Sequence, residues 1–225
     1  MNELLIKLAE CIEFGKINIV SPYPPQMKGM EGADEITRRA LEEGISPQDI
    51  LSNGLMPGME RVGMKFRENR IFVPQVLMSA KAMSTAMLHL KPHFLSGAVR
   101  QKGTFIIGTV LGDLHDIGKN LVGMMVEGNG YKVVDLGTDV GAEKFINAVN
   151  ENPGAVVGLS ALLTTTMVSM QHITSEIKES IPGTLVTIGG APVNNDFCMK
   201  IGADHYSPDP QGVVEFLNEK AAQLN

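Results

Sequence analysis

The sequence predicts two parts of different fold class, an N-terminal all-α helical bundle and a C-terminal α/β domain. Methionine is concentrated in the first 99 residues, whereas glycine-rich, β-branched runs begin only after residue 103. Pro92, Gly97 and Gly103 interrupt the chain between these two regions, as expected of a linker. We therefore expect one domain over residues 1–95 and a second over residues 96–225.

The first half contains four segments in which apolar residues recur at helical spacing, residues 2–14, 34–43, 46–66 and 74–90. Gly44 is a suitable left-handed cap for the second helix. Ser46 and Pro47 are typical of a helix start, and Pro57 predicts a kink in the helix that follows. Residues 19–32 are too rich in proline and glycine to be regular, so we expect a loop there.

The second half contains four short β-branched runs and a weaker fifth, TFIIGTV, KVVDLG, AVVGLS, TLVTIGG and ADHYS. A helical stretch follows each run. Continuously apolar strands that alternate with helices indicate a parallel sheet covered on both faces. Five such units predict a flavodoxin-like (Rossmann-type) five-stranded parallel sheet, in which ligands bind beyond the carboxyl ends of the strands.

Composition excludes several classes of protein. With 44% hydrophobic and 20% charged residues, the chain is not expected to be disordered. No apolar run reaches the roughly 18 residues of a membrane span, and the N-terminus lacks the pattern of a secretory signal. A net charge of −6 argues against nucleic acid as a partner, and two cysteines fit a reducing compartment. We expect a cytoplasmic protein that binds neither nucleic acid nor membrane.

A histidine follows an aspartate by two residues just after the first predicted strand, in Asp113-Leu114-His115. Asp113 can accept a hydrogen bond from one imidazole nitrogen and leave the other as a metal ligand. Gly118 lets the next helix start close to this loop. Taken alone, the same pair is also compatible with an ordinary polar loop.

Two further strand ends carry unusual residues. The third strand ends in Ser160 and a row of hydroxyls that extends to Thr166, and the fourth ends in Gly189-Gly190. Helix capping by serine and threonine would explain the hydroxyls, and a tight turn would explain the glycines. The order of the three motifs, each after an apolar strand, is more informative than any one of them.

DLHDIGKN, followed by GLSALLTTT and IGGAP, resembles the cobalamin-binding domain of methionine synthase. It resembles the small corrinoid proteins of methyltransferase systems more closely. Residues 41–83, LEEGISPQDILSNGLMPGMERVGMKFRENRIFVPQVLMSAKAM, are similar to the helical cap that precedes the cobalamin domain in those proteins. The resemblance covers nearly the whole chain.

The resemblance implies that cobalamin binds with its dimethylbenzimidazole displaced and His115 as the lower cobalt ligand. Asp113 would bond to His115, and Thr166 stands where methionine synthase has a serine linked to that aspartate. The displaced nucleotide tail would descend beside the sheet. The implied cofactor-binding residues of this domain are Asp113, His115, Asp116, Ile117, Gly118, Ser160, Leu162, Thr164, Thr166, Gly189 and Gly190.

Phe66, Val73 and Val76 match the cap positions that cover the upper face of the cofactor. From the residues alone, plain packing of the bundle is the simpler interpretation. The resemblance also implies a cap that moves aside, for which the residues around Gly97 suit a hinge. His205 and Tyr206 end the fifth strand near the expected tail pocket, and their contact with the cofactor is left open.

The function implied is that of a methyl carrier. A substrate-specific methyltransferase would load the carrier, and a second methyltransferase would pass the methyl group to a thiol or tetrahydrofolate. A reductive activator would restore oxidised cobalt. Methanol, methylamines, betaines and aryl methyl ethers all remain open as donors.

Two other classes of protein share part of this pattern. HDIGK also occurs in metal-dependent histidine–aspartate phosphohydrolases, but that family is all helical, whereas His115 follows a strand. His89 and His93 have helical spacing, and the sequence predicts no carboxylate beside them. A cobalamin-binding mutase subunit would lack the helical cap, a sensor would add an output module, and no phosphate-binding glycine motif supports a nucleotide-binding protein.

Overall fold

The computed structural model describes residues 2–95 and 99–224. The chain forms two compact units. The first comprises Met1–Gln101 with Gly128–Gly130, and the second comprises Lys102–Glu127 with Tyr131–Asn225. Gly97, where the hinge is expected, lies outside the described residues.

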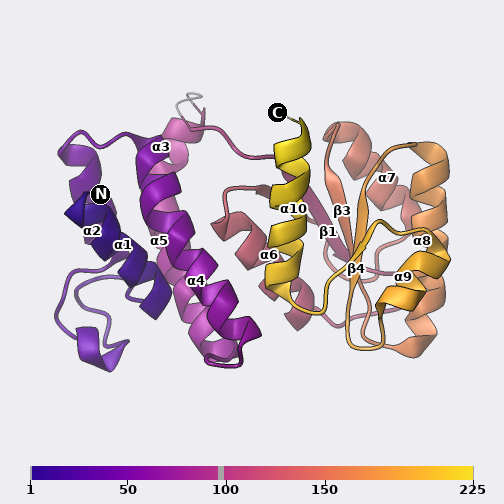
Figure 1. Cartoon of the computed structure of the whole chain (residues 1–225), viewed down its shortest axis with the longest axis horizontal. Helices are drawn as coiled ribbons and strands as arrows, with labels where there is room; N and C mark the ends of the chain where they lie inside the picture. Colours follow the sequence, from indigo (N-terminus) through magenta and orange to yellow (C-terminus); the bar gives the residue numbers. More distant parts are fainter. Residues whose placement is uncertain (1, 96–98, 225) are drawn as a thin grey trace. The chain divides into compact units, whose positions relative to one another are not determined.

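The first unit is helical, as predicted (Figure 1). Its α-helices are α1 (Glu3–Phe14), α2 (Ala33–Glu42), α3 (Pro47–Asp49), α4 (Met56–Arg67) and α5 (Val73–Leu95). The predicted helix ends are present. Gly44 has a left-handed φ of +80°, and the Ser46 hydroxyl accepts a hydrogen bond from the Asp49 N–H at 3.0 Å.

Pro57 and Pro92 do not have the local effects that the sequence predicts. Instead of a simple kink at Pro57, residues Ile50–Leu55 form a π-helical turn before α4, and the Met56 N–H donates to the Leu51 carbonyl five residues back. Such a wide turn accommodates Pro57, which has no N–H to donate. Pro92 does not end a helix, because α5 continues through it to Leu95.

Residues 19–32 form the predicted loop, with one short 3₁₀ turn at Pro25–Met27. Lys16 is fully buried, and its ammonium group donates to the Ser21 carbonyl at 2.8 Å. The Glu35 carboxylate accepts from the backbone N–H groups of Ile19 and Gly32. These bonds attach the loop to α1 and α2.

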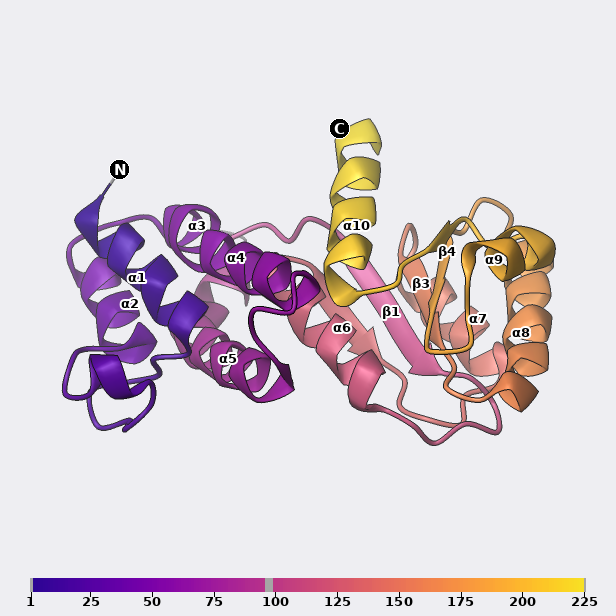
Figure 2. The ribbon, with the colours of Figure 1, turned by 60° about the horizontal axis from the view of Figure 1, so that its bottom comes forward.

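The second unit contains five parallel strands in the order β2-β1-β3-β4-β5, which confirms the predicted sheet. The strands are β1 (Thr104–Thr109), β2 (Lys132–Asp135), β3 (Val156–Ser160), β4 (Val186–Gly189) and β5 (His205–Tyr206). The helices are α6 (Ile117–Gly128), α7 (Ala142–Glu151), α8 (Met167–Ser180), α9 (Asn195–Ile201) and α10 (Pro210–Leu224). Figure 2 shows α6 and α10 on one face of the sheet and α7, α8 and α9 on the other.

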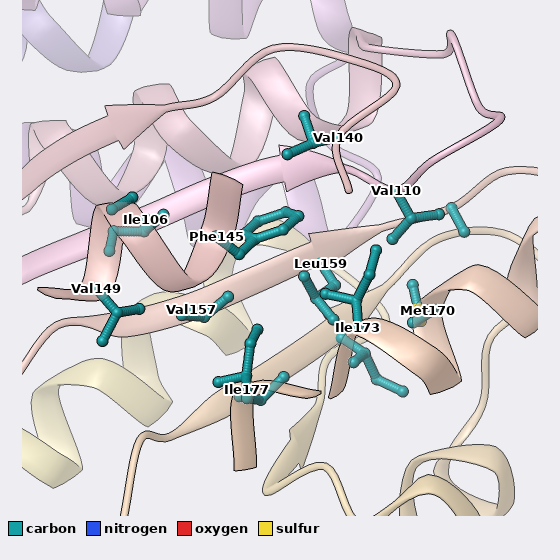
Figure 3. Packing of buried hydrophobic residues seen from close by; sticks show 14 of the residues in the cluster. Ile106, Val110, Val140, Phe145, Val149, Val157, Leu159, Met170, Ile173 and Ile177 are labelled. Atoms are coloured by element: carbon teal, nitrogen blue, oxygen red, sulfur yellow. The ribbon is translucent and has the colours of Figure 1, made fainter. Parts of the chain in front are cut away.

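The face toward α7 and α8 is packed with apolar side chains (Figure 3). Val157 and Leu159 of β3 point into this core, as do Val186 and Ile188 of β4. The Phe145 ring of α7 fills the space over Gly108, where an added Cβ would approach the ring to 2.7 Å. Shape as well as hydrophobicity therefore fixes α7 on the sheet.

The opposite face is polar toward the carboxyl ends of the strands. Because side chains alternate along a strand, Thr109, Ser160 and Thr187 point away from the apolar core. Thr109 is in register with Ser160, and Thr187 with His205. The His205 ring stacks on Phe216 of α10, with centroids 4.3 Å apart, so this polar face lies under α10.

The substitution Phe145→Ala should lower the free energy of unfolding by about 3–5 kcal/mol, because it leaves a cavity over Gly108. Chemical denaturation measures this loss. Met199→Ala on α9 is the control, since the Met199 side chain is 65% exposed. An equal loss in both variants would contradict the packing described for α7.

Glu13 joins α1 to α4 by ion pairs with Arg61, at 3.0 Å, and with Lys65. Burial by itself raises the pKa of Glu13, but the hydrogen bonds from Lys65 and Arg61 outweigh it and hold the pKa below its ordinary value of 4.5. A carboxyl whose pKa is lowered by folding stabilises the native state above the unfolded pKa. This stabilisation is lost as the pH falls through the folded value.

We expect Glu13→Gln to destabilise the protein by roughly 0.5–1 kcal/mol near neutral pH, because the pair is partly exposed. The difference from wild type should shrink below pH 4.5. Denaturation curves at several pH values measure it, with exposed Glu10→Gln as control. A difference that stayed constant down to acid pH would show that the ion pairs contribute nothing.

Candidate functional site

The loop between β1 and α6, residues 110–116, is held on several sides by hydrogen bonds. The Thr109 hydroxyl donates to the His115 carbonyl at 2.9 Å, and the Asp113 N–H donates to the Val110 carbonyl at 3.1 Å. The loop after β2 supports it from the side, because the Gly112 N–H donates to the Asp139 carboxylate at 2.7 Å. We call residues 110–116 the ligand loop.

Asp113 is fully buried, and both of its carboxylate oxygens are hydrogen-bonded. Oδ1 accepts from the His115 N–H at 3.1 Å and lies 2.7 Å from His115 Nδ1. Oδ2 accepts from the Leu162 N–H at 2.7 Å and from the Thr166 hydroxyl at 2.8 Å. One carboxylate therefore connects the end of β1 to the end of β3.

Burial disfavours the charged form of Asp113, but the hydrogen bonds from Leu162, His115 and Thr166 outweigh it and hold its pKa well below the ordinary value. The group is therefore a carboxylate at neutral pH and can only accept hydrogen bonds. His115 must then carry a hydrogen on Nδ1, so Nε2 is the only ring nitrogen that can offer a lone pair to a metal. The His115 side chain is 52% exposed, so Nε2 is available to a ligand.

Thr166 provides the hydroxyl bond to Asp113 that the resemblance implies. Its Oγ1 also lies 2.9 Å from the Leu163 carbonyl, but a hydroxyl has only one hydrogen. The ionised carboxylate is the stronger acceptor. Thr166 therefore stabilises the charge that orients His115.

The other predicted residues of this unit also lie at the carboxyl end of the sheet. Asp116, Ile117, Gly118, Leu162 and Thr164 are exposed there. Ser160 and Gly189 are half-buried and pair in register across β3 and β4. An added Cβ at Gly118 would meet nothing within 4 Å. These residues leave room for a ligand beside His115.

Gly190 has a structural reason to be glycine. Its φ is +128°, and an added Cβ would lie 1.8 Å from the Ala161 carbonyl oxygen. The backbone of the neighbouring loop therefore lies too close to Gly190 to leave space for a side chain. A tight turn, which the sequence also allows for this motif, accounts for Gly190.

Several large apolar residues in the ligand loop and in the segments next to it are exposed to solvent. Exposure of several such residues in one region marks an interaction site. They come from the ligand loop, α6, the β3–α8 connection and α8, and are Leu111, Leu114, Ile117, Leu162, Leu163 and Val168. We call them the apolar rim. A flat, largely apolar ligand would fit around Nε2 of His115.

Phe66, Val73 and Val76 belong to the first unit, whereas all other predicted site residues belong to the second. Phe66 lies in the last turn of α4, and Val73 begins α5. Val76 is 1% exposed, and the other two are half-buried. Burial explains Val76 as a packing residue without any ligand.

The expectation that no carboxylate lies beside His89 is wrong. His89 Nε2 lies 2.6 Å from Asp34 Oδ1, because α5 packs on α2 and brings together residues far apart in sequence.

In residues 2–95 and 99–224, no group of three or more His, Cys, Asp or Glu side chains could hold a metal ion. No helix in these residues is long and apolar enough to cross a membrane.

Sequence reasoning missed Asp139, Lys119 and Asp135. The Asp139 carboxylate caps the Gly112 N–H, and its own N–H donates to the Asp113 carbonyl at 3.0 Å. The Lys119 side chain is almost fully buried and pairs with the Asp135 carboxylate at the end of β2. Asp135 and Asp139 lie in the sequence DLGTD, residues 135–139, at the end of the second strand. Because β2 pairs with β1, aspartates at this position could have been predicted to lie beside the ligand loop.

Comparisons with known proteins agree with this geometry. Two models described as B12 binding domain match residues 103–213 and residues 30–91. A trimethylamine corrinoid protein of Methanosarcina barkeri is 41% identical over 188 residues, which cover 82% of this chain and 87% of the relative. A corrinoid protein of Desulfitobacterium hafniense is 37% identical, over 82% of this chain and 88% of the relative.

Two solved structures are similar over almost the whole chain. The methanol:cobalamin methyltransferase complex of M. barkeri aligns with a TM-score of 0.82 and 32% identity, covering 98% of this chain and 80% of that chain. A cobalamin-binding protein of D. hafniense aligns with a TM-score of 0.74 and 27% identity, covering 96% and 97%.

The chain belongs to the B12-binding corrinoid proteins of methyltransferase systems. Its cofactor is a corrinoid. The residues present fit such a group. Nε2 of His115 is an imidazole nitrogen, which suits cobalt, and the apolar rim suits a broad macrocycle.

Thr166→Val should lower the free energy of unfolding by about 1–3 kcal/mol, because the buried Asp113 carboxylate loses a hydrogen bond. Denaturation of the cofactor-free protein measures this, and Thr166→Ser should restore most of the loss. Thr165→Val, at the exposed neighbouring residue, is the matched control. If Thr165→Val were as destabilising as Thr166→Val, the bond to Asp113 would not explain the loss.

Proposed function

We propose that this chain is a methyl carrier that binds its corrinoid with the lower base displaced and His115 as the cobalt ligand. One observation supports this most directly. The buried Asp113 carboxylate lies 2.7 Å from His115 Nδ1, which leaves Nε2 free at the carboxyl edge of the sheet, inside the apolar rim. This is the place where ligands of parallel sheets bind.

Each residue of the site has a separate role. When bound, the corrinoid supplies a cobalt that accepts a methyl group and releases it to an acceptor. Asp113 fixes the tautomer and the orientation of the His115 ring, while Thr166 and the Leu162 N–H hold Asp113 in place. Leu114, Ile117 and Leu162 are exposed in this structure and would exclude water around Nε2 once the corrinoid lies against them.

The remaining predicted residues also have roles in this proposed binding mode. Asp116 and Gly118, with Ser160, Thr164 and Gly189, border the polar face of the sheet and would accommodate the cofactor's nucleotide tail. Residues 1–95 would form a cap domain and residues 96–225 the cobalamin domain. Phe66 and Val73 of the cap would shield the upper side, with Val76 packed behind them.

The partners proposed are two methyltransferases and a reductive activator. Similarity to a protein in a methanol:cobalamin methyltransferase complex supports a substrate-specific methyltransferase. Relatives named for trimethylamine, dimethylamine and monomethylamine favour a methylated amine or methanol as donor. A second methyltransferase would use a thiol or tetrahydrofolate as acceptor, and the whole system would operate in the cytoplasm.

Electron paramagnetic resonance tests the His115 ligand directly. Protein grown with ¹⁵N-histidine is reconstituted with cob(II)alamin that carries ordinary ¹⁴N. Coordination by His115 should split the cobalt lines into doublets, since ¹⁵N has nuclear spin one half, whereas the cofactor's own base would give triplets. His115→Ala should abolish the doublets and change the absorption spectrum.

The control is His172→Ala, which removes an exposed histidine of α8 in the same unit. Its spectra should match those of wild type. Triplets in the labelled wild-type protein, or doublets that survive in His115→Ala, would refute the assignment.

A further inference from the structure

A cavity of about 660 Å³ lies at the amino ends of the strands in the second unit, at the opposite edge of the sheet from the ligand loop. Its lining includes Thr104 at the start of β1, Val156 at the start of β3 and Leu185 just before β4. Cavities of roughly 300–1,000 Å³ accommodate small organic ligands. None of the described residues that line it belongs to the ligand loop or to the apolar rim, so the proposed function does not account for it.

One part of the cavity is apolar. Val149 of α7, labelled in Figure 3, and Ala155 belong to the apolar core of the second unit, and Ile181 after α8 packs against that core. Leu217 of α10, which is 2% exposed, contributes from the other side. An apolar ligand group placed here would therefore extend the core and leave water.

Two lysines give the lining its charge. Lys102 precedes β1, and Lys220 lies three residues after Leu217, on the same face of α10. No Asp or Glu is among the described residues that line the cavity. Glu219 lies 3.9 Å from the Lys220 ammonium, but its side chain is 66% exposed, so it compensates that charge only weakly.

Lys102 is held by two neighbours. Its ammonium group donates to Asn218 Oδ1 at 2.9 Å and lies 5.6 Å from the centre of the Tyr131 ring. The Tyr131 hydroxyl donates to the same Asn218 oxygen at 3.0 Å. Burial raises the pKa of Tyr131 to about 12, so its hydroxyl stays protonated at neutral pH and adds no negative charge. This end of the cavity is therefore ordered and positively charged.

Phe105 separates the cavity from the face proposed for the nucleotide tail. It is fully buried on β1, and its ring covers Gly158 of β3, where an added Cβ would collide with the ring. Gly158 lies two residues beyond Val156, toward the carboxyl end of the strand. A packed aromatic ring thus stands between the cavity and the site at His115.

We propose that this cavity binds a small organic anion with an apolar body, of the class of carboxylates that carry a hydrocarbon chain. Lys102 and Lys220 pair with the carboxylate, and the apolar lining from α7, α10 and the segment after α8 buries the chain. A cationic analogue of the same length lacks this pairing. The site goes beyond methyl transfer, and it exists whether or not a corrinoid is bound at the other edge.

Titration of the full-length protein with octanoate, followed by ¹H–¹⁵N NMR, tests the proposal. The backbone N–H signals of Gly103, Gly154 and Gly183 should shift, because these glycines line the cavity. The signal of Gly137, after β2 at the opposite edge of the sheet, should not move. Octylammonium should bind about tenfold more weakly than octanoate, the effect of one charge-assisted hydrogen bond.

The double variant Lys102→Met with Lys220→Met keeps most of both aliphatic stems and removes their charges. It should bind octanoate about tenfold more weakly than wild type. Lys200→Met is the matched control, because Lys200 is an exposed lysine of α9 outside the lining, and it should bind as wild type does. Asn150→Trp, at an exposed position of α7 that lines the cavity, should fill the space and abolish binding. Circular dichroism confirms that each variant is folded.

Several outcomes would overturn the proposal. They are equal affinity for octanoate and octylammonium, octanoate binding that survives in the double lysine variant, and shifts confined to the apolar rim. Shifts of the same three glycine signals when the ligand-free protein is diluted would also overturn it, since a second copy of the chain would then occupy the cavity. The proposed function is decided separately, because His115→Ala should bind octanoate as wild type does.

Discussion

The buried carboxylate of Asp113 is the interaction on which the site depends. A charge in the interior is tolerated only when hydrogen bonds replace its lost hydration. Here the donors come from two segments, His115 in the ligand loop and Leu162 with Thr166 after β3. The same bonds that keep Asp113 ionised therefore join the two loops and aim the His115 ring outward.

The two faces of the sheet differ in the side chains that they carry near the site. The face under α7 and α8 is filled by apolar side chains, which supplies stability independent of any ligand. The face under α6 and α10 is also apolar toward the amino ends of the strands, where Phe105 and Ile107 are buried. Only toward the carboxyl ends does it carry hydroxyls and His205, so the polar groups are confined to the edge of the sheet at which the site lies.

The sequence predicted much of this fold because its signals were local. Continuous β-branched runs predicted the five strands, and Ser46 and Gly44 predicted helix ends. Where neighbouring elements decide, local reasoning failed. The π-helical turn before Pro57 and the His89–Asp34 contact both depend on how helices pack, which no spacing rule reports.

Part of the candidate site could also be predicted from the sequence. Asp113 and His115 were found because they are two residues apart at a strand end. Asp139 and Lys119 were missed because they act from a neighbouring strand and from inside a helix. The resemblance to corrinoid proteins implies roles that residue spacing could not, such as the place proposed for the nucleotide tail beside Ser160.

Gly190 also limits how this protein can be modified. Its backbone touches that of Ala161, so the two loops that follow β3 and β4 cannot be varied independently. Under the proposed binding mode, libraries intended to change corrinoid preference should leave these two positions fixed and randomise Thr164 and Thr165, which are exposed. The two loops would then keep their backbone conformation while the side chains beside the proposed site change.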